Sequence, residues 1–211
     1  MTPSTSRVLT HPLAFIGGGN MARSLIGGLI KRGADPSRIR VAEPNEPLRA
    51  ALAADFGVQV FTEAGEAAYG ADTWLFAVKP QVMRTVCESL APMAQAQRPL
   101  VVSIAAGITV AQMQRWLGGG VPVVRSMPNT PALLGAGVTG LHASDEVDSA
   151  GRERAELLLA AAGPTVWIDA EAKMDAVTGV SGSGPAYVFL LAEAMEAAAV
   201  GEGRSAGAAR T

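Results

Sequence analysis

Short apolar runs alternate with longer amphipathic segments over residues 13–168. Several of these runs are apolar at consecutive positions, which is typical of strands whose two sheet faces are both covered by helices. A repeated strand–helix–strand order favours right-handed crossovers between parallel strands. The pattern therefore predicts an α/β fold with a doubly wound, mostly parallel sheet.

The expected elements follow directly from this alternation. Six strands are expected at residues 13–16, 39–42, 58–61, 73–78, 100–104 and 121–126. The helices between them are expected at residues 21–32, 47–56, 64–71, 82–93 and 110–117. Two further strands are expected at residues 138–142 and 165–168, separated by a helix at residues 148–162.

The pattern changes after Asp169. Residues 171–200 are rich in Ala and helical in propensity, with an interruption at residues 181–185. Residues 186–200 are apolar around most of a helix, and such a helix is normally buried against partner helices. We therefore expect two domains, residues 1–169 and residues 170–211, the second being the incomplete start of a helical domain.

A glycine motif of the form G-x-G-x-x-A follows the first strand and opens the next helix. Its residues are Gly17, Gly18, Gly19, Asn20, Met21 and Ala22. In such a motif the first glycine permits a tight turn, the second admits a pyrophosphate, and the last small residue allows close helix packing. The anion would lie on the helix N-terminus. This predicts a Rossmann-like dinucleotide site.

Glu43 ends the second strand, 24 residues after Gly19. That spacing is close to the ~20 residues expected for the acid that binds a ribose diol. The alternative is a structural glycine turn followed by a solvated glutamate.

Two later strand ends should face the same ligand, because open α/β sheets bind ligands at the carboxyl ends of their strands. One end contains Ala77, Val78, Lys79 and Pro80, where the proline is expected to halt the strand. The other continues into Ala105, Ala106 and Gly107, whose small size leaves room for a ring or a ribose. Taken alone, Lys79 would be a solvated residue at the end of a strand. A cofactor site is favoured because three strand ends, those before Gly17, Lys79 and Ala105, are expected at the same edge of the sheet.

Two segments are candidates for the substrate side. The loop after the sixth strand contains Met127, Pro128, Asn129 and Thr130, which bring donors and acceptors to the same edge. The second segment is Ser181, Gly182, Ser183 and Gly184, where a broken helix would expose amides and hydroxyls to an anion. The competing interpretations are an ordinary turn and a plain helix boundary.

Composition narrows the function classes. The net charge is −2, and the scattered Lys and Arg residues argue against nucleic acid and membrane surfaces. A single cysteine excludes a disulfide framework, and no membrane span or signal peptide is evident, so we expect a soluble cytoplasmic protein. No metal-ligand spacing and no catalytic residue stands out, and His11 and His142 are expected at the surface. A cofactor and its substrate should therefore carry most of the chemistry.

Five segments together resemble one family. In chain order they are FIGGGNMA, AVKPQ, SIAAGIT, RSMPNTPALLGAGVTGL and DAVTGVSGSGPAYVFLLAEA. They are similar to Δ1-pyrroline-5-carboxylate reductase, the last enzyme of proline biosynthesis, and the similarity runs from Leu13 to Thr211. The combination of RSMPNTP with SGSGPAY carries most of its specificity.

The resemblance implies hydride transfer from NADPH or NADH to the C=N carbon of a cyclic imine acid, giving L-proline. It places the cofactor at residues 17–22, 77–80 and 105–107, and the substrate at residues 127–131 and 181–184, where backbone amides would meet its carboxylate. It also implies a homo-oligomer joined through a helical dimerisation domain. Because a cyclic imine is readily protonated, the reaction needs the substrate to be positioned more than it needs a strong catalytic acid.

The sequence departs from the family in three ways. Ala64 stands where the family often has an asparagine that contacts the ribose, and Glu43 favours NADH although many members use NADPH. The family also continues beyond this end with dimerisation helices and a substrate-contacting threonine, so we expect a C-terminally truncated, poor catalyst. Two alternatives remain. One is a non-catalytic dinucleotide-binding remnant, and the other is another imine or F420-type reductase. The segment SGSGPAY argues against the second.

Overall fold

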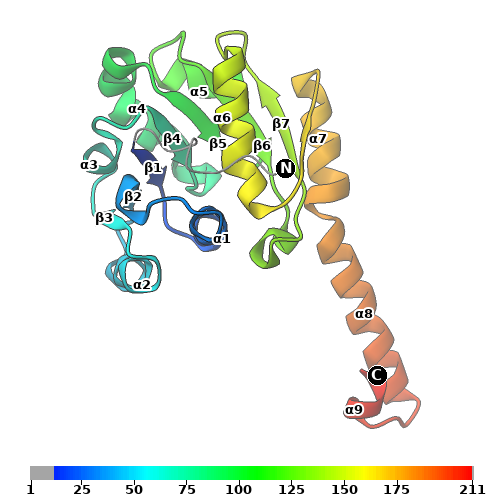
Figure 1. Ribbon diagram of the computed structural model, residues 1–211. Coiled ribbons are helices and arrows are strands. Elements are labelled where there is room, and N and C mark those ends of the chain that lie inside the picture. Colours follow the sequence, from blue (N-terminus) through cyan, green and yellow to red (C-terminus); the bar gives the residue numbers. More distant parts are fainter. Residues whose placement is uncertain (1–11, 211) are drawn as a thin grey trace.

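The computed structural model describes residues 12–210, which form an eight-stranded sheet with helices on both faces (Figure 1). The strands lie in the order β3-β2-β1-β4-β5-β6-β7-β8. Their bounds are β1 Leu13–Ile16, β2 Ile39–Ala42, β3 Gln59–Phe61, β4 Thr73–Phe76, β5 Leu100–Ser103, β6 Val123–Met127, β7 Thr139–Ala143 and β8 Thr165–Trp167. All described neighbours pair in parallel except β6 and β7, which are antiparallel. The predicted fold class is confirmed.

Several helices begin at a residue whose side chain satisfies free backbone groups of the first turn. The helices are α1 Asn20–Lys31, α2 Glu46–Phe56, α3 Ala64–Ala68, α4 Pro80–Gln97, α5 Val110–Trp116, α6 Ser149–Leu159, α7 Met174–Val177, α8 Gly184–Gly201 and α9 Ala206–Ala209. Asn45 caps α2, Asp148 caps α6, and Thr109 forms a capping box with Gln112 at α5. Gly57 ends α2 in a left-handed conformation.

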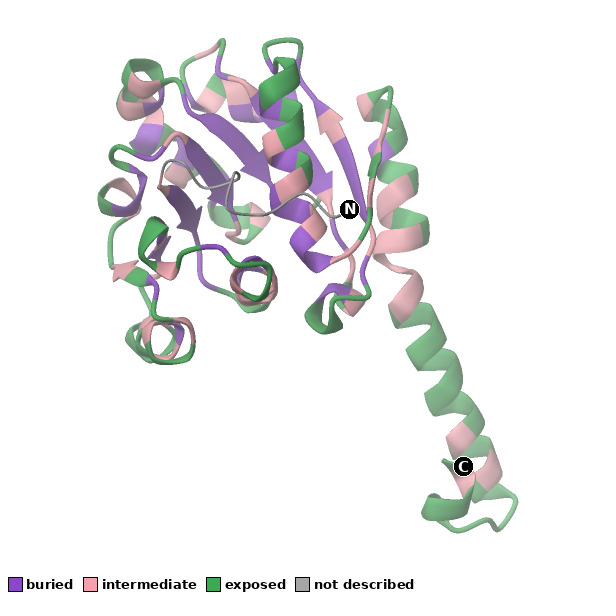
Figure 2. Ribbon diagram, viewed as in Figure 1, coloured by how far each residue is buried: buried purple, intermediate pink, exposed green. Residues whose placement is uncertain are grey.

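The core is divided into two layers by the sheet, because successive strand residues point to opposite faces. Val101 and Val123 face the layer formed by α3, α4 and α5. Val102 and Val124 face the layer formed by α1, α2 and α6. The consecutive apolar positions thus reflect a sheet that is buried on both sides, as Figure 2 shows.

Some predicted element ends were wrong by a few residues. The strand expected at residues 73–78 ends at Phe76, and Pro80 begins α4 because its fixed φ suits the first helical position. Met127, expected in a loop, is the last residue of β6. His142, expected at the surface, is half-buried, with its Nδ1 3.0 Å from the Ile168 carbonyl oxygen. His11 lies outside the described residues.

The predicted break near residues 181–185 was wrong. A π-helical turn, Thr178–Gly182, connects α7 to α8, so the two helices continue as a single rod (Figure 1). The Ser183 amide donates to the Thr178 carbonyl oxygen at 2.9 Å, and the Ser181 hydroxyl donates to the Val177 carbonyl oxygen at 3.0 Å. Widening the helix by one residue keeps these backbone groups bonded despite the glycines, which explains why no gap opens.

Helix α8 extends away from the sheet, and none of its residues is buried (Figure 2). Over residues 12–210, no helix has the length and apolarity needed to cross a membrane.

Candidate functional site

The turn between β1 and α1 is shaped by glycine. Gly17 has φ +104°, and a Cβ atom there would lie 2.7 Å from the Ala77 carbonyl oxygen, so a side chain is excluded. Gly19 is the N-cap of α1 and provides no side-chain cap, while a Cβ atom there would meet no atom within 4 Å. The helix N-terminus therefore opens onto free space that an anion can enter.

Glu43 is bound to the same turn. Its carboxylate accepts the Gly18 amide on Oε2 and the Asn45 amide on Oε1, each at 2.9 Å. These contacts fix the half-buried carboxylate at the end of β2, beside the glycine turn. Each carboxylate oxygen keeps further acceptor capacity, which suits the hydroxyl groups of a ribose.

A cleft of about 590 Å³ lies along the carboxyl ends of β1, β2 and β4. The predicted residues that line it are Gly17, Gly19, Glu43, Ala77, Val78 and Lys79. Predicted residues that do not line it are Gly18, Asn20, Met21, Ala22, Pro80, Ala105, Ala106 and Gly107. Among the latter, Ala22 is buried in the core and the Gly18 amide is already bound to Glu43.

Sequence reasoning missed most of the far wall of this cleft. The additional lining residues are Ile16, Ala42, Pro44, Leu48, Thr62, Glu63, Val82, Thr85, Val86 and Ser89, together with Ala64, which the resemblance had placed at the ribose. Val82 and Val86 lie four residues apart on one face of α4, and this spacing was the available signal. The lining carries two carboxylates, Glu43 and Glu63, and one ammonium group, Lys79.

The segment after β5 lies beside this edge of the sheet. Ile104 donates its amide to the Phe76 carbonyl oxygen at 3.1 Å, which keeps the ends of β4 and β5 together. Ala105 is buried, whereas Ala106 and Gly107 are exposed, with Gly107 at φ +74°. The two small exposed residues leave the strand end open.

The two predicted substrate segments meet. The Asn129 Nδ2 donates to the Ser181 carbonyl oxygen at 3.2 Å, and its Oδ1 accepts the Val138 amide at 3.0 Å. A Cβ atom at Gly182 would lie 2.7 Å from the Met127 Cε, so the Met127 side chain packs directly against Gly182. Asn129 therefore uses its amide group to join backbone segments.

The remaining residues of these segments differ in accessibility. Pro128 is buried, which removes it from direct contact with a ligand, whereas Thr130 is exposed. Ser183 and Gly184 are half-buried, and a Cβ atom at Gly184 would meet nothing within 4 Å. Gly184 therefore borders open space.

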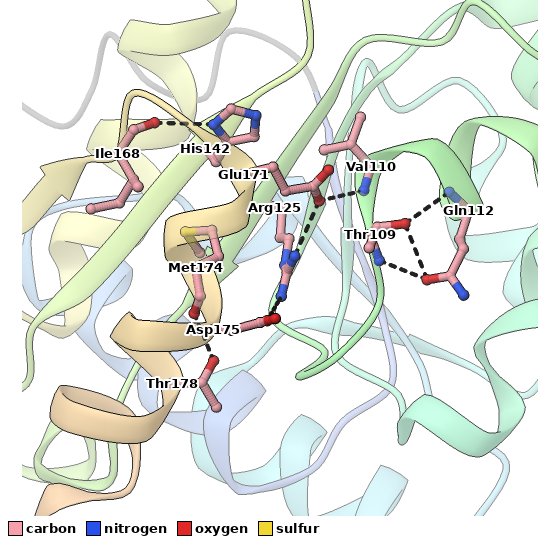
Figure 3. A network of polar contacts seen from close by, with 10 residues as sticks. All are labelled: Thr109, Val110, Gln112, Arg125, His142, Ile168, Glu171, Met174, Asp175 and Thr178. Carbon is pink, nitrogen blue, oxygen red and sulfur yellow. Dashed lines mark hydrogen bonds and ion pairs between the residues drawn. The ribbon is translucent and has the colours of Figure 1, made fainter.

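An ion-pair network around the buried Arg125 was also missed (Figure 3). Arg125 on β6 places its guanidinium 3.2 Å from both the Glu171 and the Asp175 carboxylates. The Glu171 Oε1 also accepts the Val110 amide, at 2.8 Å. The available signal was a charged residue inside the apolar run VPVVRS, because a buried charge requires partners.

No nucleophile or metal centre competes with the cleft among residues 12–210. Burial raises the pKa of the Cys87 thiol to about 12, with a smaller contribution from Glu88, so this cysteine is a neutral packing residue. Within the same residues, His, Cys, Asp and Glu side chains form no group able to hold a metal ion.

Two family models match the chain. Residues 12–107 match "NADP oxidoreductase coenzyme F420-dependent", and residues 171–211 match "Pyrroline-5-carboxylate reductase dimerisation". Together with the glycine turn and the cleft, they define the class of the protein: a nicotinamide-dependent oxidoreductase with a Rossmann-like fold.

Curated relatives cover both halves of the chain. It is 51% identical to the pyrroline-5-carboxylate reductase of Pseudomonas aeruginosa, over 88% of this chain and 68% of the relative. It is 44% identical to that of Haemophilus influenzae, over 89% of this chain and 69% of the relative. The chain belongs to the pyrroline-5-carboxylate reductase family, which uses NAD(P)H, so the resemblance drawn from the sequence is confirmed.

Solved structures support the same conclusion. The enzyme from Coxiella burnetii matches with a TM-score of 0.88 and 38% identity, covering 95% of this chain and 74% of that one. The enzyme from Plasmodium falciparum, solved with NADP bound, matches with a TM-score of 0.83 and 26% identity, covering 96% and 74%. The family match also decides against an F420-type reductase. The F420-dependent model matches only residues 12–107, whereas the pyrroline-5-carboxylate reductase relatives match 88% of the chain or more.

Proposed function

We propose that this chain reduces 1-pyrroline-5-carboxylate to L-proline with a hydride from NAD(P)H, the last step of proline biosynthesis. The observation that carries this function is the contact between the Asn129 loop and Ser181, which joins the two substrate segments at the end of β6, in the same sheet whose β1, β2 and β4 ends border the cleft. Membership of the reductase family supports the same reaction. A nicotinamide cofactor supplies the hydride when bound, and the residues of this chain position the two reactants.

The cofactor half is assigned to the cleft and the neighbouring strand ends. The pyrophosphate would lie on the open N-terminus of α1 at Gly19, and the adenosine would enter between Glu43 and the apolar face of α4. Lys79 would face the phosphates, and Ala106 and Gly107 would border the nicotinamide ribose. The open space at Gly19 supports this fit, because nothing there opposes an anion.

NADH is the cofactor that the residues favour. Glu43 and Glu63 place two carboxylates in the cleft, and like charges would oppose the 2′-phosphate of NADPH. Glu43 is also held by backbone amides at the position that binds a ribose diol. Since Ala64 offers no polar group at its position, selectivity would depend mainly on Glu43.

The substrate half is assigned to residues 127–130 and 181–184. Thr130 and Ser183 would offer hydroxyl groups, and the small residues of the π turn would admit the carboxylate of the imine. Asn129 and Met127 would shape this pocket by contact with Ser181 and Gly182. The reaction needs positioning more than a strong acid, because the imine nitrogen is readily protonated.

The test is cofactor oxidation by the purified chain. Addition of pyrroline-5-carboxylate should start NADH oxidation at 340 nm, in step with formation of L-proline measured by chromatography. Saturable cofactor binding without imine-dependent oxidation would instead identify a non-catalytic binding protein. Titration of both cofactors by fluorescence tests the NADH preference separately.

Three further assignments belong to this proposal. The domains divide near residue 169, since β8 ends at Trp167 and the C-terminal helices follow Glu171. The protein forms homo-oligomers through α8, in keeping with the dimerisation model that matches residues 171–211. A reductase of proline biosynthesis acts in the cytoplasm, without nucleic-acid partners, which agrees with the scattered basic residues and the net charge of −2.

A further inference from the structure

A buried arginine joins the sheet to the segment that leads into the substrate half. Arg125 lies on β6 with its side chain only 5% exposed, and its guanidinium bridges Glu171 and Asp175, each at 3.2 Å (Figure 3). Both acids precede the π turn Thr178–Gly182 in the same continuous helical segment. The start of this segment is therefore fixed by a charge within the sheet.

A second contact makes the attachment three-sided. The Glu171 Oε1 that faces Arg125 also accepts the amide of Val110, the first residue of α5, at 2.8 Å. Strand β6, helix α5 and the segment leading into α7 thus converge on a single carboxylate. The planar guanidinium suits this arrangement because its fixed fork can bridge two carboxylates, whereas a lysine ammonium is a point charge.

Packing contacts connect the ion pairs of Arg125 to the proposed substrate residues, 127–130 and 181–184. Val177 packs on Gly140 of β7, where a Cβ atom would lie 2.8 Å from the Val177 Cγ1. Arg125 and Met127 are two residues apart on one strand, so they lie on the same face of the sheet. The Met127 side chain in turn packs against Gly182. A shift at Glu171 would therefore change the position of the π turn against β6.

We propose that Arg125 is a positioning residue for imine reduction. Through Glu171 and Asp175 it sets the placement of residues 181–184 against the loop at residues 127–130, without itself touching substrate or cofactor. The inference rests on the proposed function for the identity of the substrate. Arg125 does not line the cofactor cleft, so its loss should affect the imine and leave cofactor binding intact.

Steady-state kinetics test this split. Arg125→Met should raise the KM for the imine by roughly 10-fold or more, about the loss of one well-placed substrate contact, because residues 181–184 are no longer held against the loop at residues 127–130. The dissociation constant for NADH should stay at the wild-type value. Arg125→Lys should restore part of the loss, because it keeps the charge but cannot bridge both carboxylates.

A matched control comes from another ion pair between elements. Arg154 on α6 lies 3.3 Å from Asp72, the residue before β4. This ion pair is therefore at the amino ends of the strands, whereas the cofactor and substrate segments are at their carboxyl ends. Arg154→Met removes an ion pair that is more exposed but also joins two elements, and it should leave the KM for the imine unchanged. An equal rise in KM in this variant would mean that general loosening of the fold explains the effect, and would overturn the proposal.

Amide hydrogen exchange gives a readout that does not require turnover. Arg125→Met and Glu171→Gln should both accelerate exchange in residues 177–184 while leaving residues 17–22 unchanged. Glu171→Gln removes the charge that pairs with Arg125 but keeps an oxygen for the Val110 amide. It therefore still tests the role of the ion pair if Arg125→Met fails to fold. Wild-type exchange and wild-type imine KM in Glu171→Gln would overturn the proposal. A wild-type chain without turnover would reject the proposed function alone, since the exchange experiment still tests the attachment.

Discussion

Gly17 and Gly19 lie two residues apart but are required for different reasons. Gly17 cannot carry a side chain because its φ is +104° and the Ala77 carbonyl oxygen blocks a Cβ atom. Gly19 has an ordinary φ of −69°, and a Cβ atom there would meet only open space. The first glycine thus serves the fold, and the second leaves room for a ligand.

Alanine substitutions should separate these two roles. Gly17→Ala should lower the free energy of unfolding by about 1–3 kcal/mol, because it adds strain at a position closed to side chains. Gly19→Ala should leave stability nearly unchanged but weaken binding of both NADH and NADPH, since the methyl group occupies the anion space. Urea unfolding and cofactor titration measure the two effects. Undiminished cofactor affinity in Gly19→Ala would remove this turn from the binding site.

Glu43 should act on cofactor choice. Glu43→Ala removes the acceptor for a ribose diol and the negative charge that opposes a 2′-phosphate, so affinity for NADH should fall relative to NADPH by roughly 10-fold or more. Loss of the Gly18 amide's partner would affect both cofactors alike and so leave this ratio unaltered. Glu46→Ala is the control, as this acid is exposed and does not line the cleft. An unchanged ratio between the two cofactors would show that Glu43 does not contact the ribose.

At the scale of elements, Cys87 reports on how α4 packs against the sheet. Burial among Met83, Leu90 and the sheet raises the pKa of its thiol from 9.0 to about 12. Between these pH values the unfolded chain loses the thiol proton while the folded chain keeps it. The free energy of unfolding therefore falls as pH rises through this window.

Comparison with Cys87→Ala isolates the thiol. Above pH 9 the wild type should lose stability relative to the variant, by up to about 1.4 kcal/mol per pH unit. Below pH 8 the difference between the two proteins should be constant. Urea unfolding at pH 8 and pH 10.5 measures the change. Parallel pH profiles would indicate that the thiol ionises equally in both states, and hence that α4 opens to solvent.

Most elements of the sheet were predictable because their signals are local. β1 and β2 were placed correctly at both ends by apolar runs bounded by Gly, Pro or charged residues. The errors have physical causes that are not local. Met127 extends β6 because it pairs with Gly140 on β7, and the helix near Ser181 survives because a π turn keeps its backbone groups bonded.

The candidate site was predictable only where the backbone geometry of a motif determines the positions of its residues. The glycine turn and Glu43 follow from a motif with a known spacing, and they do lie together. The far wall of the cleft depends on which face of α4 turns inward, which a periodic apolar pattern gives only weakly. Arg125 finds its partners 46 and 50 residues further along the chain, so no local signal could identify them.

For the molecule as a whole, helix α8 is the unusual feature. Its 18 residues span about 27 Å, and their large apolar side chains are exposed by 59–67% at Tyr187, Val188, Phe189, Leu190, Leu191 and Met195. An exposed apolar surface of this extent normally marks an interface. Since residues 171–211 match a dimerisation model, we expect the occupant to be a second copy of the chain.

Self-association through α8 should therefore be measurable at micromolar concentration. Sedimentation equilibrium should give a mass above the 21.6 kDa of one chain, and Leu190→Glu should shift the protein toward that value. The substitution places a charge where the interface would be dry, and leaving it buried and unpaired there costs several kcal/mol. The monomer should keep its stability, because Leu190 is 67% exposed and makes no core contact.

Leu134→Glu provides the matched control, since this leucine is 89% exposed but lies on the 3-10 helix Thr130–Leu134 after β6 and is not part of α8. Its mass distribution should follow the wild type. A shift of equal size in both variants would place the association elsewhere, and a wild-type chain that stays monomeric at 100 μM would contradict the prediction. Because the change in Leu190→Glu is confined to the exposed rod, cofactor affinity should be the same in all three proteins. Loss of that affinity along with the association would mean that α8 also supports the cofactor cleft.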